Sequence, residues 1–122
     1  MGTASLLTAE QSREGDTFVV AFTGSAETES LDYVASALGK LHDAALAASS
    51  RSVTVDIRAL EFASSSCLKA FVSWLQRVQQ LDDARRYKIV FRSDNRHTWQ
   101  RRSLTALSAF AAGVVEIRPE AG

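Results

Sequence analysis

The chain has 122 residues, of which 46% are apolar and 23% are charged, which is typical of a globular domain. Its 14 basic and 14 acidic residues cancel, so no overall charge attracts nucleic acid or a membrane surface. This length predicts one domain over residues 1–122, and the single cysteine excludes an internal disulfide and favours a reducing cytoplasm.

Two strands are predicted at the start of the chain. Residues 5–11 are weakly apolar, and residues 17–23 (TFVVAFT) are rich in the β-branched and aromatic side chains that favour strands. Glu14, Gly15 and Asp16 between them are typical turn residues. We therefore expect a β-hairpin.

A polar loop over residues 24–29 is expected to lead into the first helix. Thr28 offers a hydroxyl that would cap this helix. The helix should run from Ser30 to about Ala48, because apolar residues recur there at helical spacing, at Leu31, Val34, Leu38 and Leu41.

The middle of the chain predicts a buried strand that leads into a second helix. Residues 52–57 (SVTVDI) alternate between polar and β-branched side chains, and residues 58–63 then form a short link. A helix over about residues 64–81 follows from apolar residues on one face, at Leu68, Phe71, Val72 and Leu75. In open α/β sheets this junction of strand end and helix start is where ligands and partners usually bind. It carries three hydroxyls and a thiol, from Ser64, Ser65, Ser66 and Cys67.

The last third of the chain predicts a strand, a helix and a short strand. Residues 87–92 (YKIVFR) form the first of these, with Ile89 and Phe91 on one face, and residues 93–95 form a turn. Thr98 would cap a helix ending near Gly113, and residues 114–117 form a strand that Pro119 stops. The order ββαβαβαβ predicts a mixed, mostly parallel sheet with helices mainly on one face.

Other polar residues suggest weaker functional interpretations. A basic cluster around Trp99 could meet phosphate, nucleic acid or an acidic partner, but we favour a solvated helix start with Trp99 packed on the core; its members are Arg92, Arg96, His97, Arg101 and Arg102. We expect the Asp56 carboxylate to bond a neighbouring loop or helix end. The spacing of His42 and His97 does not suit zinc, and no phosphate-binding glycine pattern occurs.

Residues 62–68 (FASSSCL) resemble the signature of STAS domains, the family named after sulfate transporters and anti-sigma factor antagonists. In that signature a strand containing Asp is followed by a hydrophobic pair, then Asp-Ser-Ser/Thr-Gly, and then a Leu that opens a helix. Asp56, Phe62, Ala63 and Leu68 match the positions that set the register. Within it Ser64 takes the place of the Asp, Ser65 that of the phosphorylatable serine, Ser66 that of the Ser/Thr, and Cys67 that of the Gly.

The resemblance implies a STAS-like α/β domain that is a regulatory switch, not an enzyme, and that has no cofactor of its own. In the family, the antagonist docks an anti-sigma factor that is also a serine kinase with the histidine-kinase-like ATPase fold. Phosphorylation of the serine releases the partner, and a serine phosphatase restores binding. Carried over here, Ser65 is the phosphoacceptor, and the partner-binding loop contains Ser64, Ser66 and Cys67, with Gly24 and Ser25 on the same edge.

The substitutions within the signature leave other functions open. Ser64 can cap a helix but brings no carboxylate, and Cys67 adds a side chain where the family has none. One alternative is therefore an unmodified scaffold subunit of a bacterial signalling complex, which would form a homo-oligomer. Another is a Cys67-based thiol enzyme or redox sensor. For all of these we expect a cytoplasmic protein without nucleic-acid or membrane partners.

Overall fold

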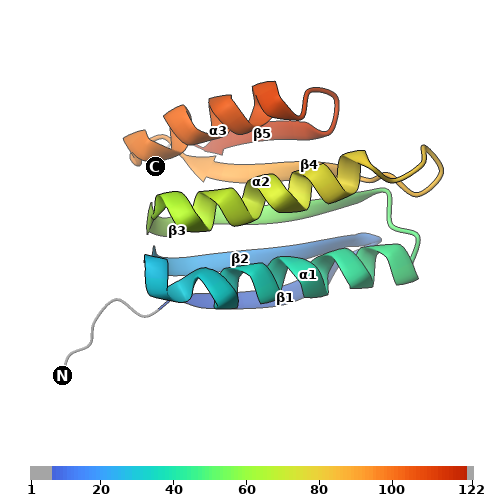
Figure 1. Cartoon of the computed structure of the whole chain (residues 1–122), viewed down its shortest axis with the longest axis horizontal. Helices are drawn as coiled ribbons and strands as arrows, with labels where there is room; N and C mark the ends of the chain where they lie inside the picture. Colours follow the sequence, from blue (N-terminus) through green and yellow to red (C-terminus); the bar gives the residue numbers. More distant parts are fainter. Residues whose placement is uncertain (1–6, 121–122) are drawn as a thin grey trace.

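Three helices lie side by side on one face of a five-stranded sheet in the computed structural model, which describes residues 7–120 (Figure 1). The strands follow in chain order across the sheet, and they are β1 (Thr8–Glu14), β2 (Thr17–Ala26), β3 (Ser52–Ala63), β4 (Lys88–Asp94) and β5 (Val115–Glu120). Only β1 runs antiparallel to its neighbour. The helical segments are η1 (Thr28–Ser30), α1 (Leu31–Ala47), α2 (Ser65–Gln79) and α3 (Thr98–Phe110).

This arrangement confirms the expected element order, the mixed and mostly parallel sheet, and the helices on one face. Parallel crossovers share one hand, so strands that follow in order place every helix on the same side. The starts of α1, α2 and α3 therefore meet at one edge of the sheet, where β2, β3 and β4 end (Figure 1). We call this the carboxyl edge. The expected first strand began at residue 5, and its first two residues lie outside the described range.

The core lies between the sheet and the helix layer. Alternate residues of the inner strands point toward the helices and are at most 3% exposed, and these are Val20, Phe22, Val53, Val55, Ile57, Ile89 and Phe91. Phe71 of α2 packs against Phe22 and Phe91, with ring centroids 5.8 and 6.0 Å apart. Burying one such ring stabilises the fold by about 2–3 kcal/mol. Phe71 thus fixes the middle of α2 over the centre of the sheet.

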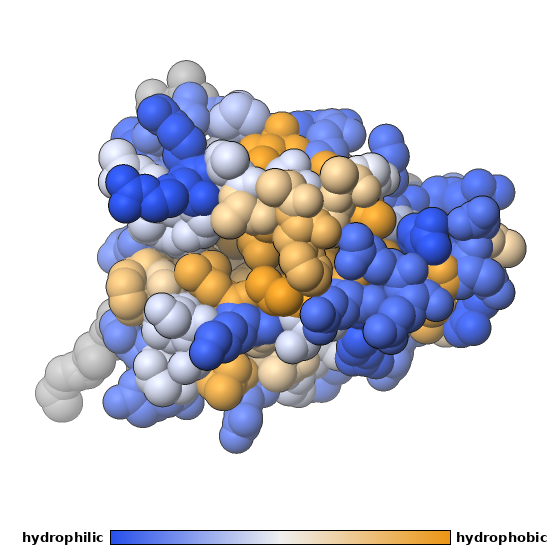
Figure 2. All heavy atoms as spheres, turned by 45° about the horizontal axis from the view of Figure 1, so that its top comes forward, coloured by the Kyte–Doolittle hydropathy of each residue, from blue (hydrophilic) through white to orange (hydrophobic). Residues whose placement is uncertain are grey.

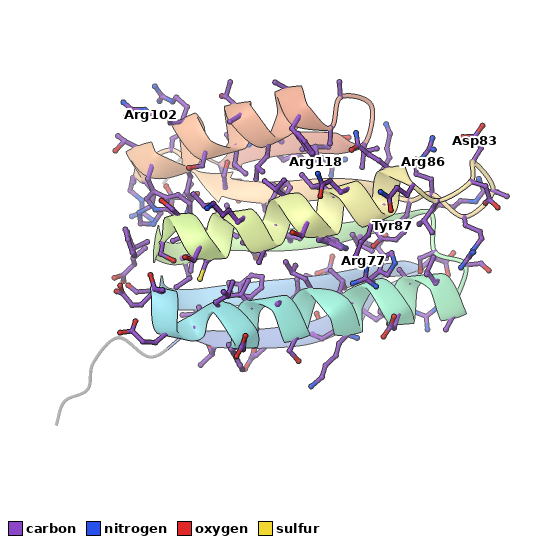
Figure 3. All side chains as sticks on the ribbon, in the orientation of Figure 1. Arg77, Asp83, Arg86, Tyr87, Arg102 and Arg118 are labelled. Atoms are coloured by element: carbon purple, nitrogen blue, oxygen red, sulfur yellow. The ribbon has the colours of Figure 1, made fainter. Side chains whose placement is uncertain are left out.

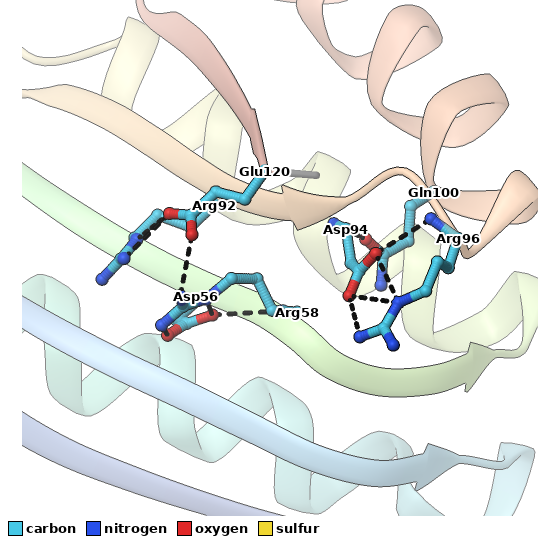
Figure 4. A network of polar contacts seen from close by, with 7 residues as sticks. All are labelled: Asp56, Arg58, Arg92, Asp94, Arg96, Gln100 and Glu120. Carbon is cyan, nitrogen blue, oxygen red and sulfur yellow. Dashed lines mark hydrogen bonds and ion pairs between the residues drawn. The ribbon is translucent and has the colours of Figure 1, made fainter. Parts of the chain in front are cut away.

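The β3 strand is longer than the sequence predicts, because residues 58–63 continue the strand and do not form a link. β4 pairs with β3 only as far as Asp56, while β2 accompanies it to Ala63 through two register shifts. Gln100 of α3, fully buried, fills the gap beyond Asp56: its Nε2 donates to the carbonyls of Ile57 and Leu60 at 2.6 and 2.9 Å. Its Oε1 accepts from the Asp94 amide at 2.9 Å (Figure 4). A side chain distant in sequence thus replaces the missing strand partner.

The loop predicted at residues 24–29 is also shorter, because β2 continues to Ala26. Gly24 pairs with Leu60 and Ser25 with Phe62, so the extended β3 holds both residues in the sheet. Gly24 has a φ of 105°, a backbone conformation that glycine adopts without strain. Ser25 is only 8% exposed.

Both predicted threonine caps are wrong. Thr28 lies inside η1, and Ser30 is the N-cap residue of α1. Thr98 is the first residue of α3, and His97 is the N-cap. In each case the helical segment begins at the threonine itself, so the threonine cannot occupy the N-cap position that precedes the segment.

Pro119 does not stop β5, which continues to Glu120. The carbonyls of Val114 and Glu120 accept from β4 and the following turn, so the even-numbered residues of β5 face β4. The backbone of Pro119 therefore faces away from the sheet. An edge strand tolerates proline there because no partner needs its N–H.

Ion pairs cover the sheet face that carries no helix within residues 7–120. Asp56 accepts hydrogen bonds from the Arg58 side chain at 3.0 and 2.8 Å, and Arg58 and Arg92 both donate to Glu120 (Figure 4). Burial opposes ionisation of Asp56, but the Arg58 hydrogen bonds outweigh it and lower its pKa. The prediction that Asp56 bonds a loop or helix end is wrong, because residues two apart on a strand share a face and Arg58 reaches it first.

Candidate partner-docking site at the carboxyl edge

Ser64 caps α2, as the sequence predicts. Its backbone is extended, with φ −68° and ψ 163°, and its Oγ accepts a hydrogen bond from the Cys67 amide at 3.2 Å. Its own amide donates to the Ala26 carbonyl at 2.8 Å, so the end of β2 also holds the turn. The Ser64 hydroxyl is thereby committed to the helix, and the residue is only 8% exposed.

Cys67 is fully buried in the first turn of α2. Its Sγ donates to the Glu27 carbonyl at 3.2 Å, which links α2 to the residue just before η1. A nucleophilic or redox-sensing thiol needs solvent access. The contacts of Cys67 instead fit a packing residue that joins two loops of the edge.

Ser65 is the exposed hydroxyl of the three serines, and it is the first residue of α2. Ser66 is half-buried and lines a hollow of about 430 Å³ between α1 and α2. Among residues 7–120 no hydrogen bond occupies the Ser65 Oγ, which leaves it available at a helix start, where unpaired N–H groups and a partial positive charge favour anions.

Phe62 adds an exposed aromatic ring near the end of β3, three residues before this serine. It is 44% exposed, although it lies in β3 and pairs with the buried Ser25 of β2. The sequence matched Phe62 to a hydrophobic pair in the STAS signature, which does not distinguish an exposed ring from a core ring. Exposed aromatic rings are frequent anchors of protein interfaces.

An apolar groove lies between α2 and α3, lined by Leu68 and Phe71 of α2 and by Trp99, Leu104 and Leu107 of α3. Leu68 and Val72 of α2 and Trp99 of α3 are half-buried along it, and Phe110, further along α3, is 43% exposed. Figure 2 shows apolar side chains gathered across this part of the surface between polar regions. The expected packing of Trp99 on the core is confirmed, but its buried Nε1 has no acceptor among the described residues. The groove offers area to an apolar partner segment.

The predicted site residues thus come together only in part. Residues 64–67 form one turn at the carboxyl edge, with Ser65 outward and Cys67 inward. Gly24 and Ser25 lie behind them in β2, so Glu27 and η1 provide the neighbouring loop. Phe62 and the α2–α3 groove were not predicted as site features, because exposure at a strand end depends on where the strand stops pairing.

Metal and membrane features can be checked over residues 7–120. This part of the chain holds no group of three His, Cys, Asp or Glu residues placed to bind a metal ion. It also contains no helix with the length and apolar character needed to cross a membrane.

Comparisons with known proteins identify the fold. The chain is similar to the crystal structure of an anti-sigma factor antagonist from Mycobacterium paratuberculosis, with a TM-score of 0.70 and 18% sequence identity. The alignment covers 98% of this chain and 92% of that one. No family model matches the sequence, and no curated protein gives a significant match. The STAS-like fold expected from the sequence is therefore confirmed.

Proposed function

We propose that this chain is a protein–protein regulatory module of the anti-sigma factor antagonist type, controlled by phosphorylation of Ser65. The observation that carries the proposal is the exposed Ser65 hydroxyl at the start of α2, beside a serine that already caps the helix. The fold shared with a known antagonist supports the same assignment.

The docking surface in this proposal combines the α2 start with its apolar surroundings. Phe62 and the α2–α3 groove provide apolar contact area, and Ser65 is the exposed first residue of α2, three residues before Leu68 of the groove. The partner is an anti-sigma factor that is also a serine kinase with the histidine-kinase-like ATPase fold, and a serine phosphatase reverses the modification. A bacterial cytoplasm suits such a switch and the single buried thiol.

A phosphate on Ser65 would release the partner for electrostatic reasons. It adds about −1.5 to −2 charges and three acceptor oxygens. The helix start tolerates these charges while they are solvated. In a docked interface shaped for a neutral hydroxyl, the phosphate would have to be desolvated, and burying an unpaired charge costs about 2–5 kcal/mol. That loss is enough to dissociate a micromolar complex.

Mass spectrometry of the protein purified from its native cells tests the proposal, with peptide mapping of residues 59–77. We expect one phosphate on Ser65 that serine phosphatase removes. In binding assays with the co-purified kinase, Ser65→Asp should abolish binding and Ser65→Ala should retain it. Phosphate on Ser64 or Ser66 would mean that a different serine is the phosphoacceptor. If no phosphate is found during growth or under stress, the proposed phosphorylation switch is wrong.

An unmodified scaffold is the second candidate function. Ser64 favours it, because an uncharged cap stands where the STAS signature has an Asp carboxylate. A scaffold predicts that Ser65→Asp binds its partner as tightly as the native chain does.

A further inference from the structure

At the carboxyl edge, acidic side chains gather on one side and basic side chains on the other. The α1 side is acidic, with Glu27, Glu29 and Asp32 at the end of β2 and the start of α1. The α3 side is basic, with Arg96, Arg101 and Arg102 around the start of α3. All six residues are exposed, and Figure 3 shows Arg102 extending from α3 near its first turn.

Contacts within the chain leave most of these charges without a partner. Arg96 pairs with Asp94 at 2.6 Å, but no ion pair within residues 7–120 involves Glu27, Glu29, Asp32, Arg101 or Arg102. Arg101 and Arg102 are also unfavourable for α3 itself, because cations near a helix N-terminus oppose its dipole and the first turn has no acidic residue. Local helix stability therefore does not explain the basic side.

The start of α2 lies between the acidic and basic sides, because α2 lies between α1 and α3 (Figure 1). Phe62 and Ser65 are exposed there, and Glu61 and Lys69 add one charge of each sign. A half-turn about an axis through this midpoint, perpendicular to the sheet, places the acidic side of one copy opposite the basic side of another. The edge is thus self-complementary, as a two-fold interface requires.

We propose that two copies of this chain associate head to head through their carboxyl edges. Glu29 and Asp32 of each copy face Arg101 and Arg102 of the other, and the two Phe62 rings meet near the axis. A standard interface needs about 800 Å² from each copy, a modest part of the 6795 Å² surface. Because exposed ion pairs are weak, the dissociation constant should lie between about 10 µM and 1 mM.

This association would also regulate access to the edge, and the proposed phosphorylation of Ser65 would oppose it. Ser65 lies near the axis, so the dimer covers it and hides it from a modifying enzyme. Phosphates on both copies would face each other and drive the copies apart. The dimer would therefore store unmodified protein in a form that other partners cannot reach.

Sedimentation equilibrium of the full chain is the first test. In about 20 mM salt the weight-average mass should rise from monomer toward dimer with concentration. In about 0.5 M salt the dissociation constant should increase at least about tenfold, because salt screens exposed charge pairs. If the protein is still monomeric at about 1 mM in low salt, the proposal is wrong. The acidic and basic sides of the carboxyl edge would then have to bind a different protein.

Charge-reversal variants identify the interface. Arg101→Glu with Arg102→Glu gives a predominantly acidic edge, and Glu29→Lys with Asp32→Lys gives a predominantly basic edge. Each variant alone should be monomeric, but an equimolar mixture should form a heterodimer, which also shows that both variants are folded. If the mixture does not associate, the proposed two-fold contact between the acidic side of one copy and the basic side of the other is wrong.

Control substitutions separate this edge from other surfaces. Lys40→Glu changes an exposed charge further along α1 and should leave the dimer intact. Phe62→Ala should weaken dimerisation and Phe110→Ser should not, whereas the opposite result would place the contact in the α2–α3 groove and reject the proposal. None of these measurements involves Ser65 modification, so either proposal can fail alone.

Discussion

Polar side chains behave in opposite ways at the two ends of the helix layer. Near the start of β4, Tyr87, His42 and Trp74 are at most 4% exposed and bond one another. The Tyr87 Oη accepts from Trp74 Nε1 at 2.9 Å and lies 2.6 Å from His42 Nδ1. At the carboxyl edge, Ser65 and most neighbouring charged side chains are exposed and have no side-chain partner among residues 7–120. The buried cluster therefore contributes to stability, while the edge remains available for binding.

Gln100 combines both behaviours, because it is a buried polar group that supports the exposed edge. Its side-chain Nε2 donates to the β3 carbonyls of Ile57 and Leu60, beyond the point where β3 stops pairing with β4. Its Oε1 accepts a hydrogen bond from the Asp94 amide. Substitutions at Gln100, in the Tyr87 cluster and at Ser65 should therefore show how far stability and binding can be separated.

Gln100→Leu should have the largest effect. It leaves two carbonyls and one amide buried without partners, which should lower the free energy of unfolding by about 3 kcal/mol. Urea unfolding measures the loss, and hydrogen exchange should increase in residues 57–63. Gln76→Leu, an exposed position on α2, is the matched control. Unchanged exchange in residues 57–63 would contradict the role of Gln100 in supporting the edge.

Tyr87→Phe should cost about 2 kcal/mol of unfolding free energy, because it leaves the Trp74 donor and a His42 nitrogen unsatisfied in the core. Tyr33→Phe is the control. The Tyr33 hydroxyl accepts a hydrogen bond from the Ala9 amide of the edge strand β1, and its removal should cost under about 1 kcal/mol. Equal losses of unfolding free energy for the two variants would show that the buried Tyr87 hydroxyl stabilises the fold no more than the exposed Tyr33 hydroxyl does.

Stability should also depend on pH through His42. Burial lowers the pKa of His42 below 6.5, and Arg77 contributes to the shift. The unfolded chain therefore binds this proton first, so stability is complete above about pH 6.5 and decreases as the pH falls toward the folded-state pKa. Urea midpoints between about pH 5 and 7 measure the slope, which His42→Gln should remove. His97→Gln should retain it, and a slope that depends on His97 would reject this origin.

Ser65→Asp should change stability least. An acidic residue at a helix start is stabilising by about 0.3–1 kcal/mol, so the unfolding midpoint should stay the same or rise slightly. Ser64→Ala removes the cap bond and should cost about 1 kcal/mol. A large loss of stability in Ser65→Asp would mean that Ser65 has a structural role. The carboxyl edge would then contribute to stability as the buried Tyr87 cluster does.

Much of the fold was predictable because it depends on local patterns. The helical spacing over α1 and the alternation in β3 and β4 reflect which side chains can share one buried face. The Ser64 cap is also local, since its hydroxyl bonds an amide three residues away. The element order then implied the sheet topology, because parallel crossovers have one hand.

The extent of the strands was not predictable from local patterns. Residues 58–63 lack a clear strand pattern and are extended because β2 and Gln100 satisfy their backbone groups. Pro119 stops a strand in sequence reasoning, but at the outer position of an edge strand it interrupts no hydrogen bond. The ion pairs on the helix-free face also include Glu120, which is distant in sequence and pairs with Arg58, the partner of Asp56.

The sequence by itself determined the order of the elements, the position of the α2 start and the serine that caps it, because these depend on residues within a few positions of one another. Only the tertiary structure decided which side chains at that start are exposed. Cys67 is buried because the segment before α1 lies against it, and Ser65 is exposed because no element in the described part of the chain covers it. Burial depends on what packs from elsewhere in the chain, so only the folded arrangement could separate the exposed hydroxyl from the buried thiol.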